Sequence, residues 1–511
     1  MSLNSSEPFI RLHSNDSVAV ARRRLLLGEV VGGLTVCSTV PAAHKIALFD
    51  LPAGAAILKY GQFIGRALTD ISAGSHVHVH NVDTGELSTA GHFILPTTPW
   101  PLLPEQERRT FQGFSRPCGR AGTRNFVAVI SSVNCSASVS HYVARRFTLD
   151  VLRQDFPEVD GVIALTHKAG CATPDDTTAL LQRVLAGMAR HPNIGAYVII
   201  GLGCETNQAA TMVRQQGLDL SENGTESPII LTIQQQGGIA KTVEEGVKAV
   251  ARLLPAVNAC RRSSQPLNRL FVALNCGGSD GNSGITANPA VGVASDLIVR
   301  HGGTTVLAET PEIYGAEHLL TRRAISKEVS DALLERVRWW ESYAQLHGAS
   351  ISNNPSAGNK EGGLTTIFEK SLGAVAKGGQ APLMSVLQYA ETVKGPGFCF
   401  MDTPGYDPVS MTGLVAGGCN VGVFTTGRGS VYGCKPAPCI KVATHTPLYR
   451  WMADDMDLNA GTILDGTESI HEVGLRVFES ILATASGERT KSELAGIGDE
   501  EFAPWQPGPV F

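Results

Sequence analysis

The sequence predicts an α/β protein in which a small, mostly β N-terminal domain precedes a large region built on a mostly parallel sheet. Residues 8–83 contain short alternating segments separated by turns. From residue 125 onward, continuous apolar segments alternate with stretches of helical spacing. The chain has 511 residues, more than a single hydrophobic core accommodates, so two or three domains are expected.

The N-terminal domain is expected over residues 8–83, with strands near 17–20 and 45–48. In residues 76–80 histidine alternates with valine, and this period of two places all three histidines on one face of a strand. Residues 84–112 contain four prolines (96, 99, 101 and 104), whose fixed φ and missing N–H predict a semi-extended linker.

The large region is expected as an α/β part over 113–390 and a second part, 391–511, that completes its sheet. Strands that are apolar throughout and alternate with helices indicate a parallel sheet covered on both faces. Helical spacing over 313–347 indicates an inserted or dimerising segment. The expected strands lie at 126–133, 161–166, 196–201, 270–274, 304–308, 397–401, 421–425 and 440–443.

Composition excludes several classes of protein. Lys+Arg is 42 and Asp+Glu is 47, and this near balance argues against binding to nucleic acid. The sequence has neither a run of 18 apolar residues nor a hydrophobic signal segment at its start, so we expect no membrane span and a cytoplasmic location. Eleven cysteines spread along a long chain do not resemble a disulfide framework, so the thiols are core residues or metal and catalytic groups.

Four cysteines follow four of the predicted strands: Cys135, Cys171, Cys204 and Cys276. Ligands of open α/β sheets bind outside the carboxyl ends of the strands, so these thiols are expected to converge there. Each also precedes a helix N-terminus, which favours the metal-binding thiolate. The alternative is that they are small residues filling turns.

Histidines and acidic residues provide further candidates. His78 and His80 form an alternative metal pair, unless they belong to a solvent-facing polar stripe. His44 and Lys45 are candidates for moving a proton or simply begin a strand. His167, near Cys171, is a ligand, a proton carrier or a loop-stabilising residue. Metal or acid/base roles also remain open for Glu205, Glu309 and Glu312.

Two polar, glycine-bearing loops suit an anionic substrate. Residues 354–363 include Asn359 and Lys360, and residues 425–429 end in Gly-Arg-Gly around Arg428. Hydroxyls, backbone amides and a guanidinium are groups that bind a carboxylate or a phosphate.

These segments together resemble the altronate/galactarate dehydratase family, which also has sulfolactate sulfo-lyase relatives. The resemblance spans nearly the whole chain. The motifs that carry it are Gly-Arg-Ala-Gly-Thr-Arg-Asn at 119–125, His-Lys-Ala-Gly-Cys at 167–171, Gly-Leu-Gly-Cys-Glu at 201–205, Cys-Gly-Gly-Ser-Asp at 276–280, Gly-Ile-Thr-Ala-Asn-Pro at 284–289, Asn-Pro-Ser-Ala-Gly-Asn-Lys at 354–360, Thr-Gly-Arg-Gly at 426–429, Ala-His-Lys at 43–45 and residues 59–81.

The resemblance implies an N-terminal SAF-type β-clip domain, a linker, a Rossmann-like sheet and a dimerising part, hence a homodimer. It also implies dependence on iron and on reducing conditions. Residues 78–81 and 302–307 resemble the altronate branch more than the galactarate branch, whereas Lys168, Ala169 and Cys434 depart from the family pattern.

The expected reaction removes water from a sugar acid to give a 2-keto-3-deoxy acid. A base takes the proton beside the carboxylate, an acid helps the hydroxyl leave, and a cation stabilises the enediolate. We expect His44, Lys45 and His167 to serve as acid or base, and Lys360, Arg428 and Asn359 to hold the substrate. The strand-end cysteines would carry Fe²⁺, with Mn²⁺ as a substitute, or an iron–sulfur cluster. The N-terminal domain would act as a lid. The alternatives are a sulfolactate-type sulfo-lyase and a non-catalytic sugar-acid-binding protein.

Overall fold

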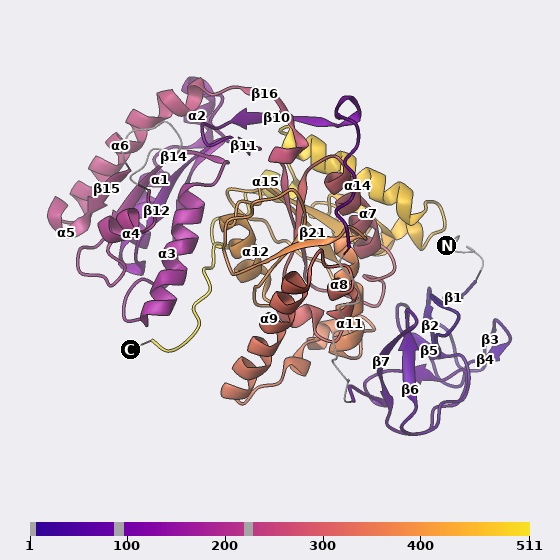
Figure 1. Ribbon diagram of the computed structural model, residues 1–511. Coiled ribbons are helices and arrows are strands. Elements are labelled where there is room, and N and C mark those ends of the chain that lie inside the picture. Colours follow the sequence, from indigo (N-terminus) through magenta and orange to yellow (C-terminus); the bar gives the residue numbers. More distant parts are fainter. Residues whose placement is uncertain (1–6, 86–96, 219–227, 511) are drawn as a thin grey trace.

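The computed structural model describes residues 7–85, 97–218 and 228–510. Figure 1 shows an N-terminal β domain at the lower right, a large central α/β domain, and a smaller α/β domain at the upper left. Part of the predicted linker, residues 86–96, lies outside the described residues. The predicted linker range also includes the start of β10 (Thr110–Ser115), which is a strand of a three-stranded antiparallel sheet with β11 (Ala121–Gly122) and β16 (Arg262–Pro266).

The N-terminal domain consists of two antiparallel sheets and a hairpin. Together with the parallel sheets of the two other domains, it confirms the predicted mixed α/β class. Its first sheet has the order β1-β2-β5-β8, its second the order β6-β7-β9, and β3 pairs with β4. The bounds are β1 Phe9–Ile10, β2 Val18–Ala21, β3 Val30–Val31, β4 Leu34–Thr35, β5 Lys45–Ala47, β6 Ala56–Lys59, β7 Gln62–Ala67, β8 His76–Val77 and β9 Val82–Asp83.

The second domain contains a four-stranded parallel sheet of order β13-β12-β14-β15. Apolar side chains of α3 and α4 cover one face, and those of α1, α2 and α6 cover the other. Burial on both faces explains why the strands are apolar throughout. The bounds are β12 Phe126–Ser131, α1 Ala137–Ala144, α2 Leu149–Asp155, β13 Gly161–Leu165, α3 Asp175–Ala189, β14 Ile194–Gly201, α4 Ala209–Gln215, β15 Ile229–Thr232, α5 Ile233–Gln236 and α6 Ile239–Ala259.

The C-terminal domain contains a seven-stranded parallel sheet of order β19-β20-β18-β17-β21-β22-β23. Helices α7 and α14 pack on one face and α12 on the other. The strands are β17 Phe271–Cys276, β18 Thr304–Leu307, β19 Leu383–Leu387, β20 Gly397–Met401, β21 Val421–Thr426, β22 Cys439–Ala443 and β23 Leu458–Asn459. The helices are α7 Ala287–Arg300, α8 His318–Thr321, α9 Lys327–Leu346, α10 Ala357–Glu361, α11 Ile367–Val375, α12 Asp407–Ala416, α13 Thr446–Trp451, α14 Ile470–Ala485 and α15 Lys491–Leu494.

The parallel strands therefore divide between two sheets. After α6 the chain enters β16, which pairs antiparallel with β10, so the next parallel strand, β17, begins a new sheet. The two domains pack directly: a side chain at Gly187 in α3 would overlap the carbonyl oxygen of Ala416 at the end of α12. The C-terminal segment runs between them in Figure 1, and Phe502 lies in the core of the second domain.

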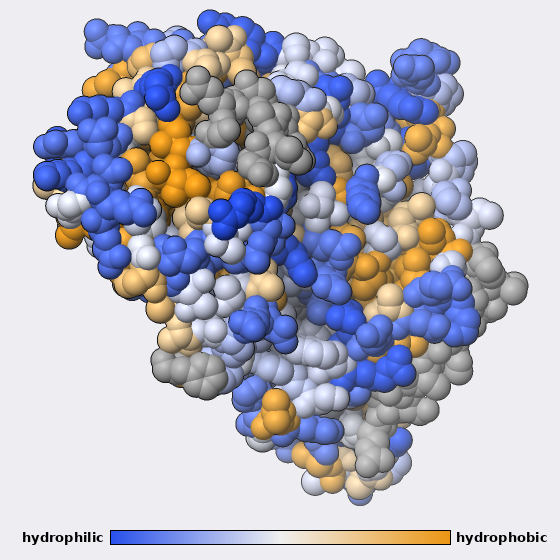
Figure 2. Space-filling view, turned by 60° about the vertical axis from the view of Figure 1, so that its left-hand side comes forward, coloured by the Kyte–Doolittle hydropathy of each residue, from blue (hydrophilic) through white to orange (hydrophobic). Residues whose placement is uncertain are grey.

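Polar residues cover most of the face shown in Figure 2, and apolar residues gather in a few places. Among the described residues, none of the helices combines the length and apolar character needed to cross a bilayer.

Candidate functional site

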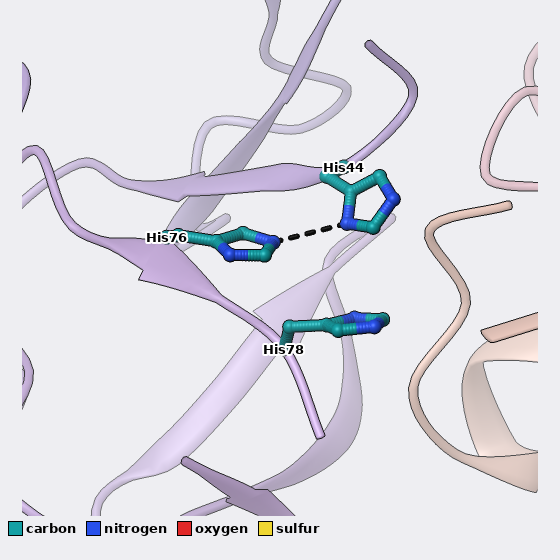
Figure 3. A group of neighbouring side chains, drawn as sticks. All are labelled: His44, His76 and His78. Carbon is teal, nitrogen blue, oxygen red and sulfur yellow. Dashed lines mark hydrogen bonds between the residues drawn. The ribbon is translucent and has the colours of Figure 1, made fainter. Parts of the chain in front are cut away.

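Three histidines of the N-terminal domain form one group at the pairing of β5 with β8. Ile46 pairs with His76 and Lys45 with Val77, so extending this antiparallel register by one residue places His44 opposite His78 on the same face. His44 Nδ1 lies 3.0 Å from His76 Nε2. Ligand nitrogens of all three rings lie within 4.8 Å of one another. Figure 3 shows the three imidazoles extending from the strands toward the same side.

The hydrogen bonding of these rings leaves lone pairs directed into the group. His44 Nε2 lies 3.0 Å from the carbonyl oxygen of Glu361, which can only accept, so Nε2 donates and the Nδ1 lone pair accepts the hydrogen bond from His76 Nε2. His78 Nδ1 is buried without a hydrogen-bond partner in the described part of the chain. Burial, reinforced by the neighbouring histidines and Lys45, lowers the pKa of His76 to about 3 and that of His78 to about 4. Three neutral imidazoles at this spacing fit a divalent transition metal.

A second group of possible ligands lies at the carboxyl ends of β17 and β18, and comprises Cys276, Glu309 and Glu312. Two ammonium groups already occupy it. Lys377 Nζ lies 2.6 Å from Cys276 Sγ, and Lys370 Nζ lies 2.6 Å from Glu312 Oε1. A cation would have to displace both lysines, so the histidine group is the better metal candidate.

Glu309 is the least satisfied residue of that second group. Both of its carboxylate oxygens are buried without a hydrogen-bond partner among the described residues. Burial, together with the Glu312 carboxylate, raises the pKa of Glu309 well above its ordinary value. The group therefore combines two lysines with a carboxyl group that favours its protonated form.

A buried ion-pair triad joins the N-terminal domain to α11. Glu369 accepts from Lys45 Nζ at 2.9 Å and from Lys59 Nζ at 2.8 Å, and all three side chains are almost completely buried. Burial would raise the pKa of Glu369, but the two ammonium groups outweigh it and hold that pKa far below the usual range. Burial lowers the pKa of Lys45 to about 8. With both lysines charged, the triad carries one net positive charge beside the histidines.

Next to this triad, the backbones of the N-terminal and C-terminal domains lie very close together. A side chain at Gly281 or at Gly363 would overlap the Ala43 carbonyl oxygen, so neither position accepts one. The Gly281 N–H also donates to the Gly362 carbonyl at 2.8 Å. The backbone of His44 is thereby held against residues 361–363 of the C-terminal domain.

Comparisons with known proteins identify the family. Family models match over residues 7–85 (altronate/galactarate dehydratase SAF domain), 113–258 (D-galactarate dehydratase/altronate hydrolase, second domain) and 267–510 (D-galactarate/altronate dehydratase, C-terminal). The chain is 38% identical to galactarate dehydratase (L-threo-forming) of Escherichia coli, covering 98% of this chain and 97% of that protein. The chain belongs to the altronate/galactarate dehydratase family.

Two other relatives define the breadth of the family. Altronate dehydratase of Bacillus subtilis is 35% identical over 95% of this chain and 96% of its own length. The β subunit of (2R)-sulfolactate sulfo-lyase from Chromohalobacter salexigens is 31% identical over 78% of this chain and 97% of its own length. The family matches confirm the resemblance and the SAF-type N-terminal domain predicted from sequence, and the curated dehydratase relatives are enzymes. Identities of 38% and 35% are too close to select galactarate or altronate.

The structure places the predicted substrate residues of this family member unequally. Arg428 is half-exposed, and its Nη2 lies 3.1 Å from the carboxylate of Glu361, the residue whose carbonyl binds His44. Lys360 is half-buried, with no side-chain partner in the described part of the chain. Asn359 is buried and its amide is already used, since Oδ1 caps α10 at Ser356 and Nδ2 donates to the Ser279 carbonyl. Arg428 and Lys360 thus remain available to a ligand, whereas Asn359 shapes the loop.

His167 is not brought together with His44 and Lys45. It lies in the second domain, where Nε2 donates to the Ser131 carbonyl at 2.9 Å and Nδ1 accepts from the Ala169 N–H. Burial lowers its pKa to about 4. Both ring nitrogens are engaged inside the chain, and this supports the loop-stabilising alternative for His167.

The expectation that four cysteines converge at one sheet is wrong for Cys276. Cys135, Cys171 and Cys204 follow β12, β13 and β14 of the four-stranded sheet, whereas Cys276 ends β17 of the seven-stranded sheet and is buried. The sequence predicts eight similar strands. It does not show that the antiparallel pair β10 and β16 separates them into two sheets.

Of the alternative metal pair His78 and His80, only His78 lies in the histidine group. Strand β8 ends at Val77, and the chain then turns, with Asn81 Oδ1 accepting from the His78 N–H. His78 joins His44 and His76, and the exposed His80 does not belong to the group. Sequence reasoning missed His76, although the same alternation contained it. It also gave no role to Glu369 and Lys59, because only tertiary structure pairs them.

Proposed function

We propose that this protein removes water from a sugar acid, an altronate-type aldonate or a galactarate-type aldarate, to give a 2-keto-3-deoxy acid. The observation that carries the proposal is the group of neutral histidines held against residues 361–363, with Arg428 beside the same segment. The dehydratase relatives, which align over nearly the whole chain, support the same reaction class.

We propose that Fe²⁺, with Mn²⁺ as a substitute, would be held here by His44, His76 and His78, so that His44 would be a ligand and not the acid or base expected from the sequence. When bound, it supplies Lewis-acid polarisation of the substrate carboxylate or hydroxyl. The donation from His44 Nε2 to the Glu361 carbonyl fixes the ring orientation and the tautomer that presents Nδ1. The N-terminal domain thus contributes ligands, and the C-terminal domain orients one of them.

The other residues of the site would bind or stabilise negative charge on the substrate. Arg428 binds the substrate carboxylate, since a guanidinium matches its geometry with two parallel hydrogen bonds. Lys360 holds a second anionic or hydroxyl group. Lys45, Lys59 and Glu369 leave one net positive charge behind the histidines, and this fixed charge stabilises the negative charge that develops when the proton next to the carboxylate is removed. Lys45 is fully buried, so it is a positioning residue in this scheme.

Loss of sulfite from a sulfonated hydroxy acid would use related enediolate chemistry. The sulfo-lyase β subunit aligns with 78% of this chain at 31% identity, and the separate sulfo-lyase α subunits align with 10% of it at 43% and 45%. Galactarate dehydratase aligns as a single protein with 98% of this chain at 38% identity. Sugar-acid dehydration is therefore the preferred proposal.

The test is to incubate the anaerobic full-length protein with a panel of aldonic and aldaric acids and with sulfolactate, with and without added Fe²⁺. We expect 2-keto-3-deoxy acid from one sugar acid, dependent on the metal. Sulfite release from sulfolactate without any dehydration would overturn the proposal, and so would sugar-acid binding without turnover in the iron-loaded protein.

A further inference from the structure

Three free, exposed thiols lie at one edge of the second domain, in a sheet other than the one that supports the proposed dehydratase site. Cys135 follows β12, Cys171 follows β13 and Cys204 follows β14, and these three strands are adjacent in the parallel sheet. Cysteine is among the most buried residue types, so three exposed thiols at neighbouring strand ends are unusual for a structural role.

The loop after β13 crosses over the end of β12. Gly170 has φ +107°, and a side chain there would lie 2.6 Å from the Ser132 carbonyl oxygen and 2.7 Å from Val133 Cα. Asn134 N–H donates to the Ala169 carbonyl at 2.9 Å, and Asn207 N–H donates to the Gly170 carbonyl at 3.0 Å. The loop that carries Cys171 is thereby bonded to the loops of both other cysteines.

Polar side chains fix these three loops. Glu205 accepts from Ser132 Oγ at 2.9 Å and from the Gly203 N–H at 2.6 Å. Asn207 Nδ2 donates to the Ser132 carbonyl, and Asn134 Nδ2 donates to the His167 carbonyl. These bonds hold the three loops in place relative to one another, as a preorganised set of ligands requires.

Two of the three sulfur atoms also accept hydrogen bonds from side chains. Thr206 Oγ1 lies 3.8 Å from Cys171 Sγ, and Gln234 Nε2 lies 3.4 Å from Cys204 Sγ. Donors directed at sulfur stabilise thiolates and adjust the potential of metal centres that thiolates bind.

The spacing of the thiols selects the type of centre. Ligands on one ion with metal–sulfur bonds of about 2.3 Å lie at most about 4.6 Å apart. Among the described residues, the three sulfur atoms do not form a group with all members within 4.8 Å. A cluster of several irons bridged by sulfide accommodates thiolates that are further apart.

We propose that Cys135, Cys171 and Cys204 bind an iron–sulfur cluster of the four-iron type, assembled from equal amounts of ferrous and ferric iron together with inorganic sulfide. Three thiolates bind three irons, so the fourth iron has no cysteine ligand and faces solvent. This centre lies in the second domain and is separate from the metal that we propose at His44, His76 and His78.

The test is anaerobic reconstitution of the full-length protein with Fe²⁺, Fe³⁺ and sulfide, followed by visible absorption, electron paramagnetic resonance after reduction, and iron and sulfide analysis. We expect about four sulfides per chain and a visible charge-transfer band. Single substitutions C135S, C171S and C204S each abolish both signals, whereas the exposed-cysteine controls C37S and C118S retain them. Circular dichroism of each apo variant verifies the fold.

The variant H76A separates the two sites. It loses the iron that we assign to the histidine group and keeps the sulfide and the visible band. Absence of bound sulfide in the reconstituted parent protein overturns the proposal, as does one thiolate-bound ion without sulfide, or a full cluster in all three cysteine variants.

Discussion

The Lys45 ammonium of the N-terminal domain and the Glu369 carboxylate of α11 form an ion pair of 2.9 Å in which both side chains are completely buried. Lys59 binds the other oxygen of the same carboxylate at 2.8 Å. One acidic residue thus fixes the domain that carries the histidines onto the domain that carries Arg428.

Replacing Glu369 by Gln leaves two buried ammonium groups without a counter-charge. We expect a loss of about 3–5 kcal/mol in the free energy of unfolding, measured by denaturant titration, because an unpaired buried charge is strongly unfavourable. The matched control is E479Q, which breaks the Arg109–Glu479 pair, whose side chains are half-exposed. It should cost less than about 1 kcal/mol. Equal losses in the two variants would contradict the role assigned to Glu369.

Gly281→Ala tests the close approach of the two domains. The added methyl group would overlap the Ala43 carbonyl oxygen and displace the neighbouring His44. We expect dehydration of the active sugar acid to fall by about 10²-fold, since a shift of about 1 Å has that effect. The control is G358A, where a methyl group meets no atom within 4 Å. Parental activity in G281A would show that docking at Ala43 is not needed.

Removal of a single histidine tests the metal group. H76A and H78A should each bind Fe²⁺ more weakly and lose activity, because two imidazoles hold a divalent metal less firmly than three. H80A should retain both properties, since His80 is exposed and lies outside the group. Iron titration and turnover are measured on the same samples. If H80A loses iron binding and turnover while H78A keeps both, the ligand assignment is wrong.

Arg428→Met tests substrate binding without disturbing the fold. Arg428 is half-exposed and its partner Glu361 is largely exposed, so stability should change by less than about 0.5 kcal/mol. Loss of a charge-assisted hydrogen bond of about 1.5–3 kcal/mol should lower kcat/KM by about 10- to 100-fold. Steady-state kinetics on the active sugar acid measure this, and an unchanged kcat/KM would exclude Arg428 from the binding site.

Buried His191, where the second and C-terminal domains meet, should make the stability of the protein sensitive to acid. Its Nε2 donates to the Cys419 carbonyl at 3.0 Å, and burial lowers its pKa to about 3. The unfolded chain takes up the proton near pH 6.5, so the stabilising effect is complete above that value and is lost as the pH falls toward 3. As the pH is lowered from about 6.5 to about 4.5, we expect the midpoint of denaturant unfolding to fall less steeply in H191Q than in the parent protein. Parallel curves would rule out His191 as a source of the acid sensitivity.

The sequence by itself determined the elements, the N-terminal SAF-type domain and the family, because these depend on local periodicity and on contiguous motifs. Apolar segments such as residues 126–131 and 421–426 are strands for the reason expected, since both faces of each sheet are covered. It also singled out His44, His78 and Arg428, which lie at or beside the candidate metal site.

Only the tertiary structure decided which of these residues meet. Cys276 and Cys135 follow similar strands, yet they belong to different sheets, because β10 and β16 pair antiparallel between them. His167 has the residue type of a proton carrier, but its ring bonds only to the backbone. Glu369 became central because two lysines more than 300 positions earlier in the chain meet it in a completely buried site. Such pairings depend on long-range packing and burial, which a local pattern in the sequence does not record.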